Sequence, residues 1–235
     1  FAIPINMVKY VTDQLMENGE VVRGFLGISI QDLDAITSQY FDGVDQGVLV
    51  AGVIDDTPAA KAGLLRDDVI IELNGKPATN AGTFKSRVSI IAPGDTANLV
   101  IIRDGKKITK KVTIAARPTD LGSSGGGQTG GSKGKSSGVS KSKSIGVTVQ
   151  NLTEDLAERF EFESTEGVVI TKVTPNSPAA RAGLRPGMLI QEVNRQTITN
   201  TDDFNAALED QEEAKSILLL VTEGEYSRYI PLKMK

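Results

Sequence analysis

The residues with which this sequence can do chemistry are hydroxyls, carboxylates, lysines and backbone amides, because its 235 residues include no histidine and no cysteine. A Ser-His-Asp triad needs an imidazole that accepts and returns a proton near neutral pH. Thiolate nucleophiles, disulfides, and metal sites made of imidazoles or thiolates are excluded in the same way. Catalysis by carboxylates or lysines alone stays open in principle. The sequence therefore predicts no catalytic residue, no metal site and no cofactor.

The overall composition narrows the class of protein further. Hydrophobic residues make up 39% and charged residues 24% of the chain, which fits globular domains with cores of their own. A net charge of −4 weighs against nucleic acid as the main partner. No apolar run approaches the roughly 18 residues of a membrane helix, so we expect no membrane span. The chain opens at Phe1 without a basic start or a cleavage pattern, and we expect any targeting signal to lie upstream.

Two halves of the chain resemble each other. Residues 47–84 align without a gap on residues 167–204, and 15 of the 38 aligned pairs are identical. Upstream of this block, GISIQDL at 27–33 matches GVTVQNL at 146–152. A period near 120 residues is too long for a solenoid repeat and indicates a duplicated domain.

The stretch between the halves, residues 118–144, has almost no apolar residues and is dominated by Gly, Ser and Lys. Such a segment buries too little surface to offset the entropy of ordering it. We predict a disordered, flexible linker with a span of roughly 25–30 Å. Its lysines could touch an anionic surface, but a solvated linker is the favoured interpretation.

Each half predicts the same order of elements: a strand, a second strand, a short helix, a strand, a longer helix and a hairpin. In the first half, alternation and turn signals place the strands at 26–31, 47–54 and 69–73 and the hairpin strands at 99–103 and 106–114. The short helix is predicted at 58–62, and the longer helix begins after its cap, Asn80. Thr57 and Ser177 are natural N-caps for the short helices, with Pro at the first helical position. Phe84, Val88 and Ile91 share one face of the longer helix. The fold class is mainly β with short helices (α+β), as two partly open barrels or sandwiches.

These elements carry two motifs that resemble PDZ domains of the bacterial protease type. The first is the glycine loop Phe25-Leu26-Gly27-Ile28, matched by Ser144-Ile145-Gly146-Val147. The second is PAAKAGLLRDDVIIELN, matched by PAARAGLRPGMLIQEVN. Both occur in order, twice. The resemblance covers residues 24–117 and 145–235, which we expect to be the two domains.

The resemblance implies that an extended C-terminal peptide adds as a strand beside residues 28–31. Its carboxylate would meet the backbone amides around Gly27, where the missing side chain allows a close approach. Its last side chain would enter an apolar pocket. The peptide-binding residues expected in the first domain are Arg23, Phe25, Leu26, Gly27, Ile28, Ile30, Phe84, Val88 and Ile91, and in the second Ile145, Gly146, Val147, Val149, Phe204 and Leu208. We expect the second site, where Ser144-Ile145 replaces Phe25-Leu26, to be the weaker one.

Residues 1–23 predict an amphipathic helix and connector, with Asn6 as cap, Val8, Val11 and Leu15 on one face, and Asn18-Gly19 as stop. Together with the opening phrase Phe1-Ala2-Ile3-Pro4, this block is similar to the end of the trypsin-like protease domain of the HtrA (Deg/Do) family. The resemblance implies an ATP-independent envelope protease and chaperone, which serves quality control and the stress response in the periplasm. Its PDZ domains would capture unfolded envelope proteins, regulate an upstream protease domain and help to assemble trimers into larger oligomers.

Three other functions stay open on the sequence alone. A PDZ pair of an intramembrane protease or secretion system leaves FAIPINMV unexplained. A free-standing scaffold that gathers partners by their C-termini leaves the N-terminal apolar stripe without a role. An independent enzyme would depend on Glu72 and Glu192, which recur in both halves, yet a lone carboxylate beside a strand is more often a structural or surface group.

Overall fold

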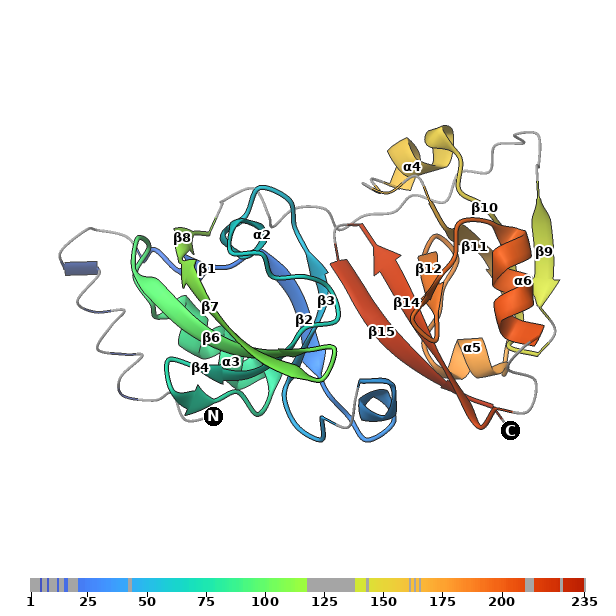
Figure 1. The fold of residues 1–235 in the computed structure, drawn as a ribbon. Helices are drawn as coiled ribbons and strands as arrows, with labels where there is room; N and C mark the ends of the chain where they lie inside the picture. The colour runs from blue at the N-terminus through green and yellow to red at the C-terminus, as the bar shows by residue number, and fades with distance from the viewer. Residues whose placement is uncertain are drawn as a thin grey trace. The chain divides into compact units, whose positions relative to one another are not determined.

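Figure 1 shows the computed structural model of the chain. It describes residues 5, 8, 12, 15, 16, 21–41, 44–117, 138–142, 144–160, 162, 164, 166–209, 214–224 and 226–234. The predicted linker 118–144 and helix 1–23 lie largely outside these residues. The five described positions before residue 20 are helical. Four of them carry exposed apolar side chains: Ile5, Val8, Leu15 and Met16.

The chain divides into two compact units, residues 1–33 with 44–124, and residues 34–43 with 125–235. Both units are mainly β with short helices, which confirms the predicted fold class. Segment 34–43, which the sequence places inside the first domain, groups with the second unit. None of the described helices combines the length and the apolarity that a membrane span requires.

The first unit is an antiparallel sheet with two short helices. Its strands follow the order β2-β3-β4-β6-β7, β5 pairs with β4, and β1 pairs with β8. The predicted strand at 69–73 is found with the same bounds, and the predicted hairpin is found around Asp104-Gly105. The elements are β1 (Gly24–Phe25), β2 (Ile28–Asp32), β3 (Val48–Val53), α2 (Pro58–Lys61), β4 (Val69–Leu73), β5 (Lys76–Pro77), α3 (Ala81–Ser89), β6 (Thr96–Arg103), β7 (Lys106–Thr113) and β8 (Ala115–Ala116).

The second unit repeats this plan and adds elements to it. Its strands follow the order β15-β14-β12-β11-β10-β9, and β13 pairs with β12. The added elements are η1, β9 and the helix α4. The elements are η1 (Thr37–Tyr40), β9 (Val139–Ser142), β10 (Val147–Asn151), α4 (Glu154–Phe160), β11 (Val168–Val173), α5 (Pro178–Arg181), β12 (Leu189–Val193), β13 (Gln196–Thr197), α6 (Thr201–Glu209), β14 (Ser216–Glu223) and β15 (Tyr226–Lys233).

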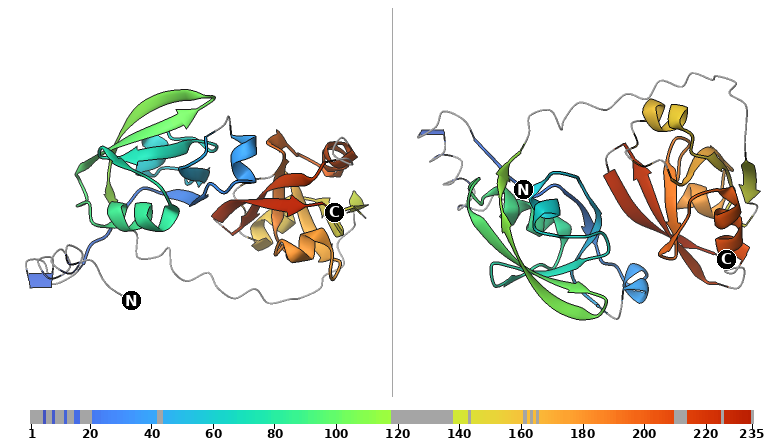
Figure 2. Two further views of the ribbon diagram at one scale, coloured as in Figure 1. Left: turned by 90° about the horizontal axis from the view of Figure 1, so that it is seen from below. Right: turned by 45° about the horizontal axis from the view of Figure 1, so that its top comes forward.

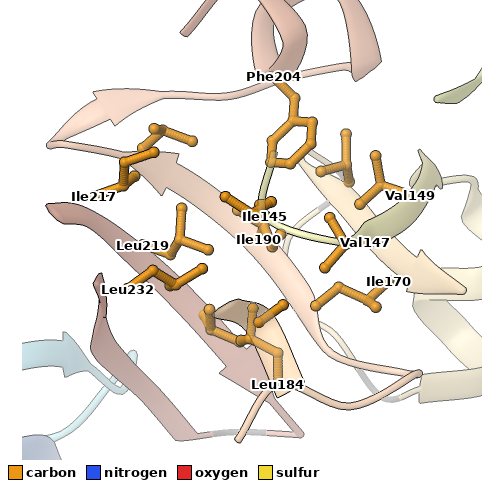
Figure 3. Packing of buried hydrophobic residues seen from close by; sticks show 14 of the residues in the cluster. Ile145, Val147, Val149, Ile170, Leu184, Ile190, Phe204, Ile217, Leu219 and Leu232 are labelled. Atoms are coloured by element: carbon orange, nitrogen blue, oxygen red, sulfur yellow. The ribbon is translucent and has the colours of Figure 1, made fainter. Parts of the chain in front are cut away.

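Each unit has its own hydrophobic core beneath the longer helix. Phe84 of α3 is 2% exposed and Phe204 of α6 is 0% exposed. Figure 3 shows Phe204 among the side chains of the second core, together with Ile145, Val147 and Val149. A smaller cluster joins α4 to the other face of the sheet through Ala157, Phe162, Val169 and Leu189.

Segment 34–43 packs within the second unit through aromatic and polar contacts. The Phe41 ring meets the Tyr229 ring edge-on at a centroid distance of 5.4 Å. The Arg195 guanidinium lies 5.0 Å from the centroid of the Phe41 ring and donates to the Tyr40 carbonyl at 3.1 Å. The Tyr40 hydroxyl donates to the carbonyl of Ser216 at 3.0 Å. Phe41 is thereby buried, although it lies outside any strand or helix.

The caps of the short helices differ between the two copies. The Ser177 hydroxyl accepts a hydrogen bond from the amide of Ala180, as an N-cap does. Thr57 has the same extended backbone, but its hydroxyl donates to the Ile54 carbonyl at 2.6 Å and makes no cap bond. The predicted capping role is therefore right for Ser177 and wrong for Thr57, whose hydroxyl braces the loop instead.

Asn80 is the N-cap of α3, and its side chain accepts from the amide of Thr83 at 2.8 Å. Asn80→Ala is expected to lower the free energy of unfolding of the first domain by about 1 kcal/mol, because that amide loses its partner. Hydrogen exchange of the first-domain amides along a urea titration measures the change. Lys85→Ala, on the exposed face of the same helix, is the control. An Asn80→Ala value as small as that of the control would contradict the cap.

Candidate functional site

The glycine loop of the first domain holds its peptide planes in one orientation. The carbonyl of Leu26 accepts from the amide of Ala59 at 2.9 Å, and the carbonyl of Gly27 accepts from the amide of Ile54 at 2.9 Å. In a planar trans peptide the N–H points opposite to the C=O. The N–H groups of Gly27 and Ile28 are therefore turned away from β3 and α2. Two neighbouring amides that point the same way form a concavity suited to a carboxylate.

Only glycine fits at the centre of this loop. Gly27 has φ of +80°, and an added Cβ would lie 2.3 Å from both Cβ and Cγ2 of Thr57. The Thr57 hydroxyl also lies 3.4 Å from the Gly27 carbonyl. The Thr57 side chain therefore packs against Gly27 and restricts the conformation of the loop. The sequence had indicated Gly27 but gave no sign of this role for Thr57.

The walls of the predicted groove are β2 and α3, which contact each other. Strand β2 lies at the edge of the sheet as the described residues build it. The Asp32 carboxylate, at the end of β2, accepts from the amide of Ala81 at the start of α3, at 2.6 Å. At the other end of the helix, a Cβ on Gly24 would lie 2.4 Å from the carbonyl oxygen of Val88. Helix α3 is thus bonded to β2 at its start and packs closely on β1 near its end. Of these residues, the sequence analysis had singled out Val88 and had passed over Asp32 and Gly24.

The predicted residues of the first site divide between groove and core. Ile28, Ile30 and Ile91 are half-buried and pack on the edge of the core. Leu26, Phe84 and Val88 are 3%, 2% and 6% exposed, and they lie within the core beneath the groove. Phe25 is half-buried in β1, opposite Ala115, and the Arg23 carbonyl accepts from the amide of Arg117 at 3.0 Å.

The second domain builds the same loop. The carbonyl of Ile145 accepts from the amide of Ala179 at 3.0 Å, and that of Gly146 accepts from Thr174 at 2.8 Å. Gly146 also has φ of +80°, and a Cβ there would lie 2.2 Å from the Cβ of Ser177. Asn151 replaces Asp32, and its side-chain oxygen accepts from the amide of Thr201 at 2.7 Å.

The predicted residues of the second site are more deeply buried than those of the first. Five of them are 0–6% exposed and belong to the core: Ile145, Val147, Val149, Phe204 and Leu208. Figure 3 shows the first four beside one another beneath α6. The difference arises at the outer edge of β10, where strand β9 pairs along it.

Comparison with known proteins agrees with this geometry. Residues 24–114 and residues 169–223 each match a family model described as "PDZ domain". The chain is 37% identical over 235 residues to a protein of Chlamydia pneumoniae named "Probable periplasmic serine endoprotease DegP-like", covering 99% of this chain and 45% of that one. A protein of the same name from Pseudomonas fulva is 35% identical over 236 residues, covering 100% and 47%.

The chain thus spans less than half of the length of these relatives. Among solved structures, the "HtrA-type protease AlgW with decapeptide" is 32% identical, with a TM-score of 0.44, covering 50% of this chain and 37% of that one.

Proposed function

The chain belongs to the HtrA (DegP-like) family through its two PDZ domains, and on this premise we propose that its first domain captures C-terminal or extended apolar peptides. The observation that carries the proposal is the orientation of the Gly27 and Ile28 amides, which point away from β3 and α2 at the start of an edge strand. A carboxylate on these amides places the preceding residues of a peptide antiparallel to β2. The backbone bonds of that added strand are independent of the peptide's sequence.

Selectivity would come from the groove floor. Ile28, Ile30 and Ile91 are partly exposed apolar side chains at the rim of a packed core. An apolar last residue would cover them and remove their surface from water, at about 25 cal/mol per Å². We therefore propose a preference for apolar C-termini, with Arg23 near the loop adding a favourable positive charge.

At the level of the whole protein, we propose a role in proteolytic quality control of the bacterial envelope. The similarity to relatives named as periplasmic serine endoproteases supports it. In this role the PDZ pair would deliver unfolded envelope proteins to an upstream trypsin-like domain, regulate that domain and take part in trimer-based assembly. Catalysis would belong to that domain and not to the residues of this chain.

Isothermal calorimetry with an apolar C-terminal peptide tests capture by the first domain. The peptide with a free carboxylate is expected to bind about 10–100-fold more tightly than the amidated peptide, because charged hydrogen bonds are worth about 1.5–3 kcal/mol. Gly27→Ala is expected to abolish binding, since the new Cβ meets Thr57 at 2.3 Å.

Gly75→Ala is the matched control for Gly27→Ala. Gly75 has φ of +72°, close to that of Gly27, but a Cβ there meets nothing within 4 Å. The two variants therefore share the backbone strain and differ in the clash within the loop. Equal affinity for the free and amidated peptides would rule out the carboxylate site without any variant.

A further inference from the structure

Strand β9 occupies the place in the second domain that a peptide ligand would take. It pairs antiparallel with β10, from Val147 opposite Ser142 to Gln150 opposite Val139. On its other side β9 contacts α6. Figure 2 shows β9 beside α6 in both views. The groove between β10 and α6 is therefore filled by a segment of the chain itself.

The polarity and end point of β9 are those of a C-terminal ligand. The strand runs toward the glycine loop, and its last residue, Ser142, ends there. The Gly146 amide, the equivalent of the Gly27 amide, donates to the Ser142 carbonyl at 3.1 Å. A backbone carbonyl thus stands where the carboxylate of a peptide would accept the same hydrogen bond.

Two further hydrogen bonds hold β9 in the groove, one between side chains and one between backbone groups. The Ser140 hydroxyl donates to the side-chain oxygen of Asn205 on α6 at 2.6 Å. The Gly138 carbonyl accepts from the amide of Asn151 at 3.2 Å, and a Cβ on Gly138 would lie 2.6 Å from the Asn151 side chain. Strand β9 is thus held by backbone pairing with β10, by a side-chain hydrogen bond to α6 and by the close packing of Gly138 on Asn151.

The consequence appears in the burial of the groove residues. Ile28 and Ile30 of β2 are half-buried, whereas Val147 and Val149 at the equivalent places are 1% and 0% exposed. In the first groove, Ile28 and Ile30 therefore keep exposed apolar surface that a ligand can cover. The second has none at these two positions.

From these contacts we propose that β9 is a tethered internal ligand that closes the second PDZ groove, so that an external peptide enters it only by displacing β9. The proposal rests on the proposed function of the first groove. A ligand tethered by a few residues acts at an effective concentration on the order of mM. Ordinary peptides at lower concentration are then excluded, and the second domain responds only to a high local density of peptide C-termini.

The test is photo-crosslinking of the whole chain with an apolar, free-carboxylate peptide that carries p-benzoylphenylalanine. The adducts are mapped by mass spectrometry. In the wild-type chain we expect adducts at β2 and α3 and few at β10 and α6. Ser140→Pro is expected to raise the adducts at β10 and α6 at least about tenfold. Gly138 and Asn151 are a hydrogen-bonded pair of the antiparallel ladder. Because bonded and non-bonded pairs alternate, Ser140 and Val149 are a bonded pair as well. Proline at position 140 has no N–H and cannot make its hydrogen bond in this pair.

Equal labelling of β10 and α6 in the wild-type and Ser140→Pro chains would overturn the proposal. If Ser140→Pro unfolds the second domain, a reversible lock decides the question: Ser140→Cys with Asn205→Cys, in a chain without native cysteine. The peptide is then supplied at several mM, on the order of the effective concentration of the tether, so that it displaces β9 in the reduced chain. Labelling of β10 and α6 that rises on reduction supports the proposal, and equal labelling of the oxidised and reduced chains overturns it. The proposed function of the first groove is tested by a different result. It is contradicted if labelling at β2 and α3 does not depend on the free carboxylate of the peptide.

Discussion

Replacing Arg103 by methionine is expected to lower the free energy of unfolding of the first domain by about 3–5 kcal/mol, because it leaves a buried carboxylate without its counter-charge. The Arg103 Nε donates to one oxygen of Asp68 at 2.6 Å and the Nη2 donates to the other at 2.8 Å. The side chain of Asp68 is 0% exposed, and that of Arg103 is 23% exposed. The hydrogen bond to Asp68 and its charge raise the pKa of Arg103 above its ordinary value, against the opposing effect of burial.

The second domain provides the control for this prediction. Met188 takes the place of Asp68 there and is 1% exposed, so the fold accepts an apolar residue at this position. The double variant Asp68→Met with Arg103→Met removes both charges and is expected to recover most of the loss. A cost of about 1–2 kcal/mol should remain, since Leu65 donates its amide to Asp68 and loses that acceptor.

Hydrogen exchange of first-domain amides along a urea titration measures both variants of this pair, and second-domain amides serve as an internal reference. A single Arg103→Met variant within 1 kcal/mol of the wild type would show that the pair contributes little. A double variant as unstable as the single one would show that lost packing, and not the stranded charge, dominates.

Much of the fold could be predicted because local and global signals agree in it. Strand β4 is a short, mostly apolar run that ends at an Asn-Gly turn, and it was predicted with the right bounds. The hairpin of β6 and β7 follows from Asp104-Gly105 between two runs of strand residues. The short helices follow from Pro at the first position and Gly after the last. None of these features depends on residues distant in sequence.

The features that the sequence analysis missed depend on partners outside the segment itself. Gly138 to Ser142 has the composition of a linker, yet it forms a strand because β10 and α6 offer it backbone and side-chain partners. Phe41 lies in a segment without periodicity, and its burial depends on Tyr229 and Arg195. No pattern within either segment carries this information, since the partners lie elsewhere in the chain.

The candidate site was predictable to the same degree. The two glycine loops follow from their sequence, because their positive φ and close neighbours require glycine. The division between groove and core could not be read from hydrophobicity, because Ile30 and Val149 are alike in type and differ only in what covers them. Whether an apolar side chain near a groove contacts the ligand is therefore decided by the neighbouring element.

Phe204 allows that distinction to be measured. A core role predicts that Phe204→Ala lowers the free energy of unfolding of the second domain by about 3–5 kcal/mol, through lost burial and the cavity left behind. The side chain is 0% exposed and packs among the apolar residues beneath α6 (Figure 3).

Phe84→Ala, at 2% exposure, should have an effect of the same size on the first domain. Urea titrations followed by hydrogen exchange in each domain measure both, with Lys85→Ala as the surface control. A variant that kept its stability within about 0.5 kcal/mol and lost only peptide binding would contradict the core role. It would show instead that its ring reaches the groove.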